Sequence, residues 1–120
     1  MAHLLVVDDE TSARTTLALL LRKRGHRVLE ADGVGAAAKS LTEEVFDLVV
    51  TDRAMPEMGG DQLATAIKQL APDRPIIMLT GFGDLMDVKG EKPAGVDVVI
   101  GKPVTFDALQ GAILQVVTRD

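Results

Sequence analysis

The sequence predicts a single α/β domain, a doubly wound sandwich in which helices cover both faces of a five-stranded parallel sheet. Two observations carry this prediction. Five short apolar runs recur along the 120 residues, and segments with helical periodicity lie between them. The runs are apolar throughout instead of alternating, which is typical of parallel strands buried on both faces. One domain is the ordinary outcome for a chain of this length.

The five apolar runs define the strands in chain order. They cover residues 3–7, 28–31, 46–51, 76–80 and 96–100. Among the orders that right-handed crossovers allow, 2-1-3-4-5 suits a five-stranded unit. In that order the connections change direction between the first and third strands. Ligands of such sheets bind at this point, outside the carboxyl ends of the strands.

Four segments show an apolar face with helical spacing, so each is expected to be a helix. Gly25 is placed to end the first helix, and Asp32 and Thr105 are placed to cap the second and the last. The four apolar faces consist of Ala13, Leu17, Leu20 and Leu21; Val34, Ala37, Ala38 and Leu41; Leu63, Ala66, Ile67 and Leu70; and Phe106, Leu109, Ile113, Val116 and Val117.

The segment 84–94, between the fourth and fifth strands, has a weaker pattern. It contains Gly90 and Pro93 and only a thin apolar stripe. Both residues disfavour a regular helix. We therefore expect a short or mobile helix, or a loop, at this position.

Composition excludes several kinds of function. The chain has no cysteine, which rules out disulfides, thiolate metal sites and a cysteine nucleophile and fits a cytoplasmic protein. A net charge of −5 disfavours direct binding to nucleic acid. No apolar run is long enough to span a membrane. The basic cluster Arg22, Lys23, Arg24 and Arg27 is expected to offset the dipole at the end of the first helix. The oligomeric state is not predicted.

Polar residues follow four of the predicted strands. Asp8 and Asp9 come directly after the first strand, Asp52 after the third, Thr80 ends the fourth, and Lys102 follows the fifth. Because the carboxyl ends of parallel strands meet at one edge, these side chains are expected to lie together. The second strand ends in 30–31 at the sheet margin, and it contributes no obvious residue to the site.

Three converging carboxylates repel one another unless a cation is present. Mg²⁺ prefers oxygen ligands and keeps several waters, so Asp8, Asp9 and Asp52 could hold it. An alternative is that residues 8–10 only cap the first helix. A carboxylate beside a cation can attack phosphorus, which makes Asp52 a candidate nucleophile. Lys102 and Thr80 could then contact phosphoryl oxygens.

These residues stand in motifs that resemble the receiver domain of two-component response regulators. The motifs are DDE at 8–10, TDRAMPEMGG at 51–60, LTG at 79–81 and GKPV at 101–104. The resemblance covers the whole chain, residues 1–120, in order. It implies a flavodoxin-like fold, Mg²⁺ dependence, and phosphoryl transfer from a phosphohistidine onto Asp52. The donor would be a histidine kinase or a histidine phosphotransfer protein, docking near the start of the first helix at Thr11, Ser12 and 14–16.

The resemblance also implies roles for single residues. Asp9 would bind the metal directly, Asp8 largely through water, and the backbone carbonyl of Ala54 would complete the protein ligands. Thr80 and Lys102 would sense the phosphoryl group. Such a domain is not a conventional enzyme by itself, since it catalyses only its own phosphorylation and dephosphorylation. The runs LTGFGD and GKPV also resemble receivers attached to hybrid histidine kinases.

Three positions depart from the family pattern or bear on its details. Val99 stands where the family usually has a switching aromatic, so we expect any switch to be an order–disorder change in 84–94. Ala54 has no polar side chain to orient water, and Phe82 could shield an acyl phosphate. Both predict slow self-dephosphorylation. For Phe82, burial in the core is the alternative.

Three rival interpretations remain. A haloacid-dehalogenase-like phosphatase would want a second acid where Ala54 stands. A docking module that is no longer phosphorylated would not need the intact set of acids, threonine and lysine. A flavin binder would want an aromatic residue to stack on the ring, and the chain has neither Trp nor Tyr.

Overall fold

The computed structural model describes residues 2–53, 60–81, 95–102 and 104–117. It contains a five-stranded sheet in the order β2-β1-β3-β4-β5, in which every neighbouring pair is parallel. The predicted fold class and strand order are therefore confirmed. The segment 84–94, Ala54, Phe82 and Pro103 lie outside the described residues, and the expectations placed on them remain predictions.

The strands lie close to the predicted apolar runs. Their bounds are β1 His3–Val7, β2 Arg27–Ala31, β3 Leu48–Asp52, β4 Ile76–Thr80 and β5 Val98–Gly101. All residues of β3 and β4 are buried, because helices cover both faces of these central strands. The third and fifth strands begin two residues later than the apolar runs.

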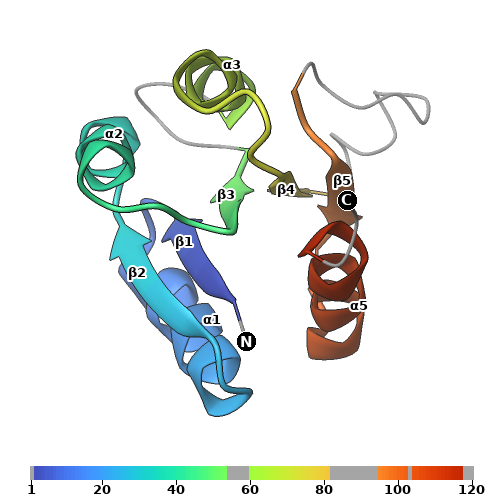
Figure 1. Cartoon of the computed structure of the whole chain (residues 1–120). Helices are drawn as coiled ribbons and strands as arrows, with labels where there is room; N and C mark the ends of the chain where they lie inside the picture. Colours follow the sequence, from blue (N-terminus) through green and yellow to red (C-terminus); the bar gives the residue numbers. More distant parts are fainter. Residues whose placement is uncertain (1, 54–59, 82–94, 103, 118–120) are drawn as a thin grey trace.

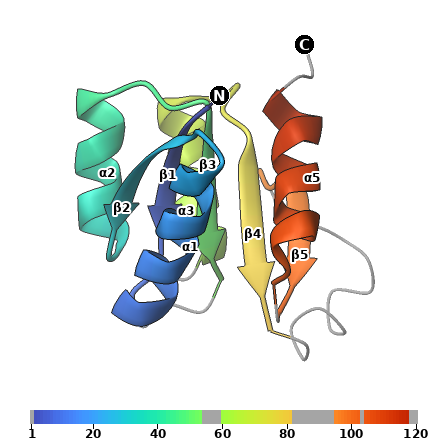
Figure 2. The same cartoon turned by 90° about the horizontal axis from the view of Figure 1, so that it is seen from below.

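The helices form two layers, one on each face of the sheet. α1 (Thr11–Lys23) and α5 (Phe106–Val117) cover one face, where Ala18, Leu21 and Ile113 join the core below β1, β3 and β4. Figure 2 shows these two helices in front of the strands, whose carboxyl ends all point the same way.

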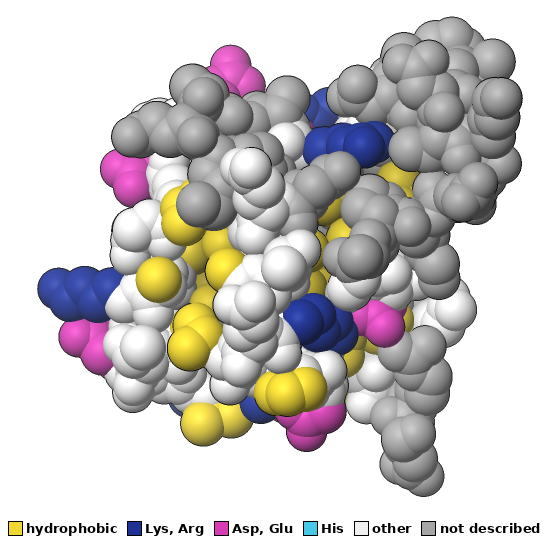
Figure 3. Space-filling view, turned by 90° about the horizontal axis from the view of Figure 1, so that it is seen from above, with side chains coloured by type: hydrophobic (Ala, Val, Ile, Leu, Met, Phe, Trp, Pro, Cys, Tyr) yellow, Lys and Arg dark blue, Asp and Glu magenta, His cyan; other side chains and the backbone are white. Residues whose placement is uncertain are grey.

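The opposite layer is formed by α2 (Val34–Glu43) and α3 (Gly60–Leu70), which lie across the sheet from α1 and α5 (Figure 1). Phe46, Leu63 and Ile67 lie in the core beneath them. Figure 3 looks onto this layer and shows hydrophobic surface in several small patches among charged and other polar side chains. Small scattered patches of this kind are normal for a folded domain.

The predicted helix ends are partly right. Gly25 follows α1 with φ of 93°, a left-handed conformation that favours glycine, and its N–H donates to the carbonyl of Arg22. The Thr105 hydroxyl accepts the N–H of Ala108 at 3.1 Å, as expected of an N-cap. The cap predicted at Asp32 is wrong, because α2 has Gly33 at its N-cap and no side-chain cap bond.

The predicted apolar face of α1 is also only partly right. Leu21 is buried, but Ala13 is exposed and Leu20 is 42% exposed, whereas Ala18 is buried. The buried face is therefore rotated from the predicted one. Ala13 and Leu20 instead flank the space between α1 and α5.

Candidate functional site

The carboxyl edge of the sheet brings the predicted site residues together. Asp52 is the last residue of β3, Thr80 the last of β4, and Asp8 and Lys102 directly follow β1 and β5. The parallel register sets Asp52 beside Leu79, and Thr80 beside Gly101. The strand order therefore positions these side chains, since β1 and β3 are neighbours at the switch point.

Three carboxylates form a tight cluster at this edge. One oxygen each of Asp8, Asp9 and Asp52 lies within 4.8 Å of the others. Asp8 and Asp52 are buried, and Asp9 is exposed. Carboxylate oxygens are the ligands that Mg²⁺ prefers, and partial exposure leaves room for water. The residues present therefore fit a divalent cation.

Electrostatics at the cluster follow from burial and like charge. Burial raises the pKa of Asp8, the nearby carboxylates of Asp52 and Asp9 raise it further, and the Glu10 N–H and Lys102 partly offset this. The pKa of Lys102 is also raised: burial lowers it, but the carboxylates of Asp52, Asp8 and Glu10 outweigh burial. A cation at this position would relieve the repulsion felt by Asp8.

Lys102 forms an ion pair with the buried carboxylate of Asp52. Its Nζ lies 2.5 Å from Oδ1 of Asp52, and the side chains are 43% and 6% exposed. Apart from this ion pair, Oδ1 of Asp52 has no hydrogen-bond donor in the described part of the chain. The Lys102 side chain is 43% exposed and has a flexible stem, so its ammonium has room to turn toward solvent.

Thr80 presents a buried hydroxyl that no described residue uses as a hydrogen-bond partner. The residue is 1% exposed, and within the described ranges its Oγ1 has no hydrogen-bond partner. A buried hydroxyl left without a partner costs free energy, so such groups are rare. The hydroxyl is thus available to a ligand at the carboxyl edge.

The helix-capping alternative for residues 8–10 does not hold. Glu10 is the N-cap of α1 and makes no side-chain cap bond. The Oδ1 atom of Asp8 accepts the N–H of Glu10 at 3.0 Å, which shapes the turn before the helix. The cluster of acids therefore is not explained by capping.

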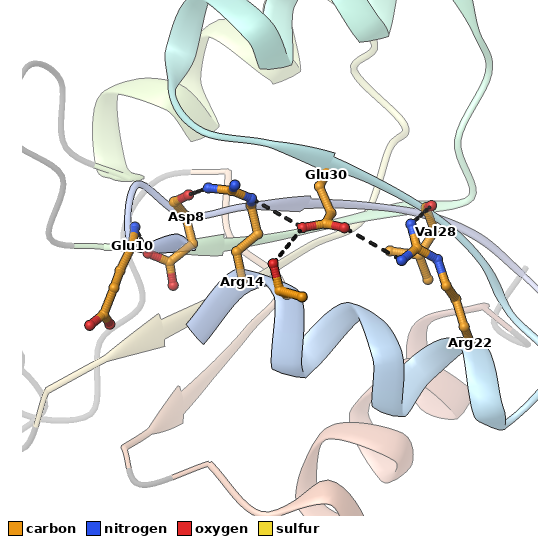
Figure 4. A network of polar contacts seen from close by, with 7 residues as sticks. Asp8, Glu10, Arg14, Arg22, Val28 and Glu30 are labelled. Atoms are coloured by element: carbon orange, nitrogen blue, oxygen red, sulfur yellow. Dashed lines mark hydrogen bonds and ion pairs between the residues drawn. The ribbon is translucent and has the colours of Figure 1, made fainter. Parts of the chain in front are cut away.

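The second strand, which makes no contribution that is obvious in the sequence, supports the acids in the structure. The carbonyl of Ala31 accepts the N–H of Asp8 at 3.0 Å, because β1 and β2 remain paired up to that residue. Glu30 accepts a hydrogen bond from Nε of Arg14, whose Nη1 donates to the carbonyl of Asp8 at 2.8 Å (Figure 4). A charged residue in a mostly apolar strand was the signal that could have revealed this contact.

A cavity of about 310 Å³ opens beside the acids, between α1 and α5. Its walls are mostly apolar, with Leu17, Leu20 and Phe106 among the lining residues, and Asp8 and Lys102 also line it. The cavity therefore runs from the apolar space between α1 and α5 to the charged residues at the carboxyl edge of the sheet.

Val99 stands where the family usually has an aromatic residue. It is partly buried and packs against the core on the α2 and α3 side.

Comparison with known proteins settles the family. The family model of the response regulator receiver domain matches residues 4–114. The chain belongs to the response regulator receiver domain family. The receiver domain therefore acts in two-component signalling, as the motifs predicted. Within the described residues, none of its helices has the length and apolar character needed to cross a lipid bilayer.

Curated relatives are longer proteins. The transcriptional regulatory protein GlrR of Escherichia coli (strain K12) is 38% identical over 112 residues, which are 93% of this chain and 25% of GlrR. The transcriptional regulatory protein ZraR of Klebsiella oxytoca is 39% identical over 108 residues, 89% of this chain and 24% of ZraR. The receiver domain thus spans about a quarter of the length of these relatives.

Solved structures show the same fold over nearly the whole chain. A response regulator receiver domain protein from Clostridium thermocellum has a TM-score of 0.91 and 33% identity, covering 99% of this chain and 96% of that one. The response regulator TrrA from Thermotoga maritima, solved in complex with Mg(2+)-BeF, has a TM-score of 0.84 and 28% identity, covering 97% and 99%.

Proposed function

We propose that residues 1–120 form one receiver domain in which Asp52 accepts a phosphoryl group from a phosphohistidine. The observation that carries the proposal is the position of Asp52. It is a buried carboxylate 2.5 Å from a single lysine ammonium and within 4.8 Å of two further carboxylates. A carboxylate so placed has a counter-charge for the group it receives and a cation site beside it.

The transfer requires no redox partner. An oxygen of Asp52 forms a bond to phosphorus, the phosphorus–nitrogen bond of the phosphohistidine breaks, and its electron pair stays on the imidazole nitrogen. Lys102 exchanges its contact with the carboxylate for a phosphoryl oxygen, and the Thr80 hydroxyl donates to another. Both roles use groups already present at the site: Lys102 is in an ion pair with Asp52, and the Thr80 hydroxyl has no hydrogen-bond partner among the described residues.

We assign the metal ligands to the side chains of Asp8, Asp9 and Asp52, together with the backbone carbonyl of Ala54. When bound, Mg²⁺ supplies positive charge that offsets the carboxylates and the phosphoryl oxygens. The clustering of three oxygens and the raised pKa of Asp8 support this assignment. The Mg(2+)-BeF complex of TrrA offers a precedent in a protein 28% identical to this chain.

We further propose that a histidine kinase or histidine phosphotransfer protein docks at the start of α1. Thr11 and Ser12 are exposed there, and the cavity between α1 and α5 opens directly beside Asp8 and Lys102. A helix of the donor laid across this groove would bring its histidine to the charged edge. An unphosphorylated docking module is disfavoured, because such a module has no use for a buried Thr80 hydroxyl that lacks a partner among the residues the structure describes.

Incubation with acetyl phosphate tests the proposal without knowledge of the natural donor. We expect the intact mass to rise by one phosphoryl group in the presence of Mg²⁺ and to stay unchanged with EDTA. Asp52→Asn should gain no mass. The control Asp47→Asn, which changes the aspartate directly before β3, should gain the same mass as the unaltered chain. Absence of any mass gain, or an equal gain in Asp52→Asn, would refute the proposal.

A further inference from the structure

Arg14 connects the acidic turn, defined here as Asp8 and Asp9, to the edge strand β2. Its Nη1 donates to the backbone carbonyl of Asp8 at 2.8 Å, and its Nε donates to Oε1 of Glu30 at 3.2 Å. Figure 4 shows the guanidinium of Arg14 between these two acceptors, above the first turns of α1. The side chain is only 13% exposed. Arg14 therefore spans from the helix to the turn that precedes it.

The contact with Asp8 bears on Asp9 through the peptide bond. The carbonyl of Asp8 and the N–H of Asp9 belong to one planar group, so fixing the carbonyl fixes the direction in which the chain enters Asp9. The N–H of Asp8 is fixed separately by the carbonyl of Ala31. Asp9 itself is exposed, so packing does little to orient it. The hydrogen bond from Arg14 is therefore well placed to set its direction.

Glu30 holds Arg14 in the conformation that reaches the turn. It is 25% exposed, and it also accepts a longer bond from the Thr15 hydroxyl at 3.4 Å. A guanidinium presents its donors in a rigid plane, so one acceptor at Nε and another at Nη1 fix its orientation. Lysine carries a charge at this position but cannot make both bonds with the same geometry.

We propose that Arg14, held by Glu30, is a positioning residue that orients Asp9 for binding of the divalent cation. This inference rests on the proposed function, since it concerns the same metal site. Arg14 is not a ligand and touches no reacting atom. It acts through the Asp8–Asp9 peptide, and outer partners of this kind commonly change metal affinity about 10–100-fold when they are removed.

A purely electrostatic role for Arg14 predicts the opposite result. Arg14 is a cation near a cation site, so removing its charge should strengthen Mg²⁺ binding if charge alone matters. Removing a positioning contact should weaken binding. The sign of the change in Arg14→Met therefore separates the two explanations.

Arg22 provides a matched control on the same helix. It donates from Nη1 to the other oxygen of Glu30 at 3.4 Å and from Nη2 to the carbonyl of Val28 at 2.7 Å. It thus shares the carboxylate and the type of bond but does not touch the acidic turn (Figure 4). Arg22→Met removes a cation and a pair of hydrogen bonds of the same kind, to Glu30 and to a backbone carbonyl, away from the metal site.

The experiment is a calorimetric titration of the whole chain with Mg²⁺. We expect Arg14→Met to weaken binding about tenfold, as for other outer partners of metal ligands. Arg14→Lys and Glu30→Gln should show smaller losses, and Arg22→Met should bind as the unaltered chain does. With acetyl phosphate, the Mg²⁺ concentration for half-maximal phosphorylation should rise in Arg14→Met, while the rate at saturating Mg²⁺ changes little.

Two results would overturn the inference, and each is distinct. If the unaltered chain binds Mg²⁺ and the Arg14 variants bind it equally or more tightly, positioning is refuted while the proposed function stands. If the unaltered chain binds no Mg²⁺, the proposed metal site fails and the inference with it. Should Arg14→Met fail to fold, Arg14→Lys and Glu30→Gln decide, because unchanged affinity in both would refute positioning.

Discussion

Replacing Asp8 with asparagine should stabilise the metal-free domain and remove most of the stability that it gains from Mg²⁺. The change removes one of three carboxylates that lie within 4.8 Å of one another. Asparagine keeps an oxygen that can accept the Glu10 N–H, so the turn before α1 retains its hydrogen bond. The substitution therefore isolates the charge of residue 8 from its structural contact.

The magnitude follows from Coulomb repulsion. Two unit charges 4.8 Å apart repel by about 3 kcal/mol at an effective dielectric constant of about 20. Lys102 lies against Asp52 and cancels much of that pair, and water screens Asp9 because it is exposed. We therefore expect the free energy of unfolding in EDTA to rise by on the order of 1 kcal/mol, or a few degrees in Tm.

In Mg²⁺, the unaltered chain should become more stable than Asp8→Asn. A ligand present at about 100 times its Kd stabilises the folded state by about 2.7 kcal/mol. The unaltered chain should gain this stability, and Asp8→Asn should gain little, because one ligand carboxylate is missing. The two stability curves are therefore expected to cross as Mg²⁺ is added.

Thermal unfolding followed by far-ultraviolet circular dichroism measures both effects, since the chain has no Trp or Tyr for fluorescence. Asp73→Asn is a suitable control, because Asp73 is exposed and precedes β4 at the opposite edge of the sheet. It should respond to Mg²⁺ as the unaltered chain does. The reasoning is refuted if Asp8→Asn is clearly less stable than the unaltered chain in EDTA, or if it keeps the full Mg²⁺ response.

Three further predictions concern the same edge and one helix end. The pKa of Asp8 is raised above 3.8 in the folded state, so the folded state holds a proton that the unfolded chain has already lost. The free energy of unfolding in EDTA should therefore fall as pH rises from about 3.8 through the folded-state pKa. Urea titrations across this pH range should show the fall in the unaltered chain and not in Asp8→Asn. Lys102→Met should lower stability in EDTA by about 2 kcal/mol by leaving Asp52 buried without its counter-ion, with a smaller loss in Mg²⁺; an equal loss in both media would contradict this. Thr105→Ala should cost about 1 kcal/mol through loss of the α5 N-cap, with unchanged Mg²⁺ affinity by calorimetry.

The sequence predicted the sheet well because burial on both faces leaves an unambiguous pattern. Residues 3–7 and 76–80 were predicted with the bounds that β1 and β4 have. The site residues could be placed for a related reason. Once strand order is known, the residue after each strand must lie at the carboxyl edge, so Asp8, Asp52, Thr80 and Lys102 follow from topology.

The errors arose where tertiary contacts decide the outcome. Leu20 has the spacing of a core residue, yet it lies beside the open cavity between α1 and α5. Asp32 has the residue type of an N-cap, but α2 begins one residue later without its help. Glu30 shows no partner in the sequence, because Arg14 is 16 residues away and is brought to it only by the packing of α1 against β2.

The chemical location of the phosphoryl group is the most direct test of the central claim. After treatment with acetyl phosphate and Mg²⁺, borohydride reduces an aspartyl phosphate to homoserine, and peptide mass spectrometry then identifies the altered residue. We predict homoserine at position 52 and at no other aspartate. Homoserine at Asp8 or Asp9, or none at all in a chain shown to bind Mg²⁺, would contradict the account.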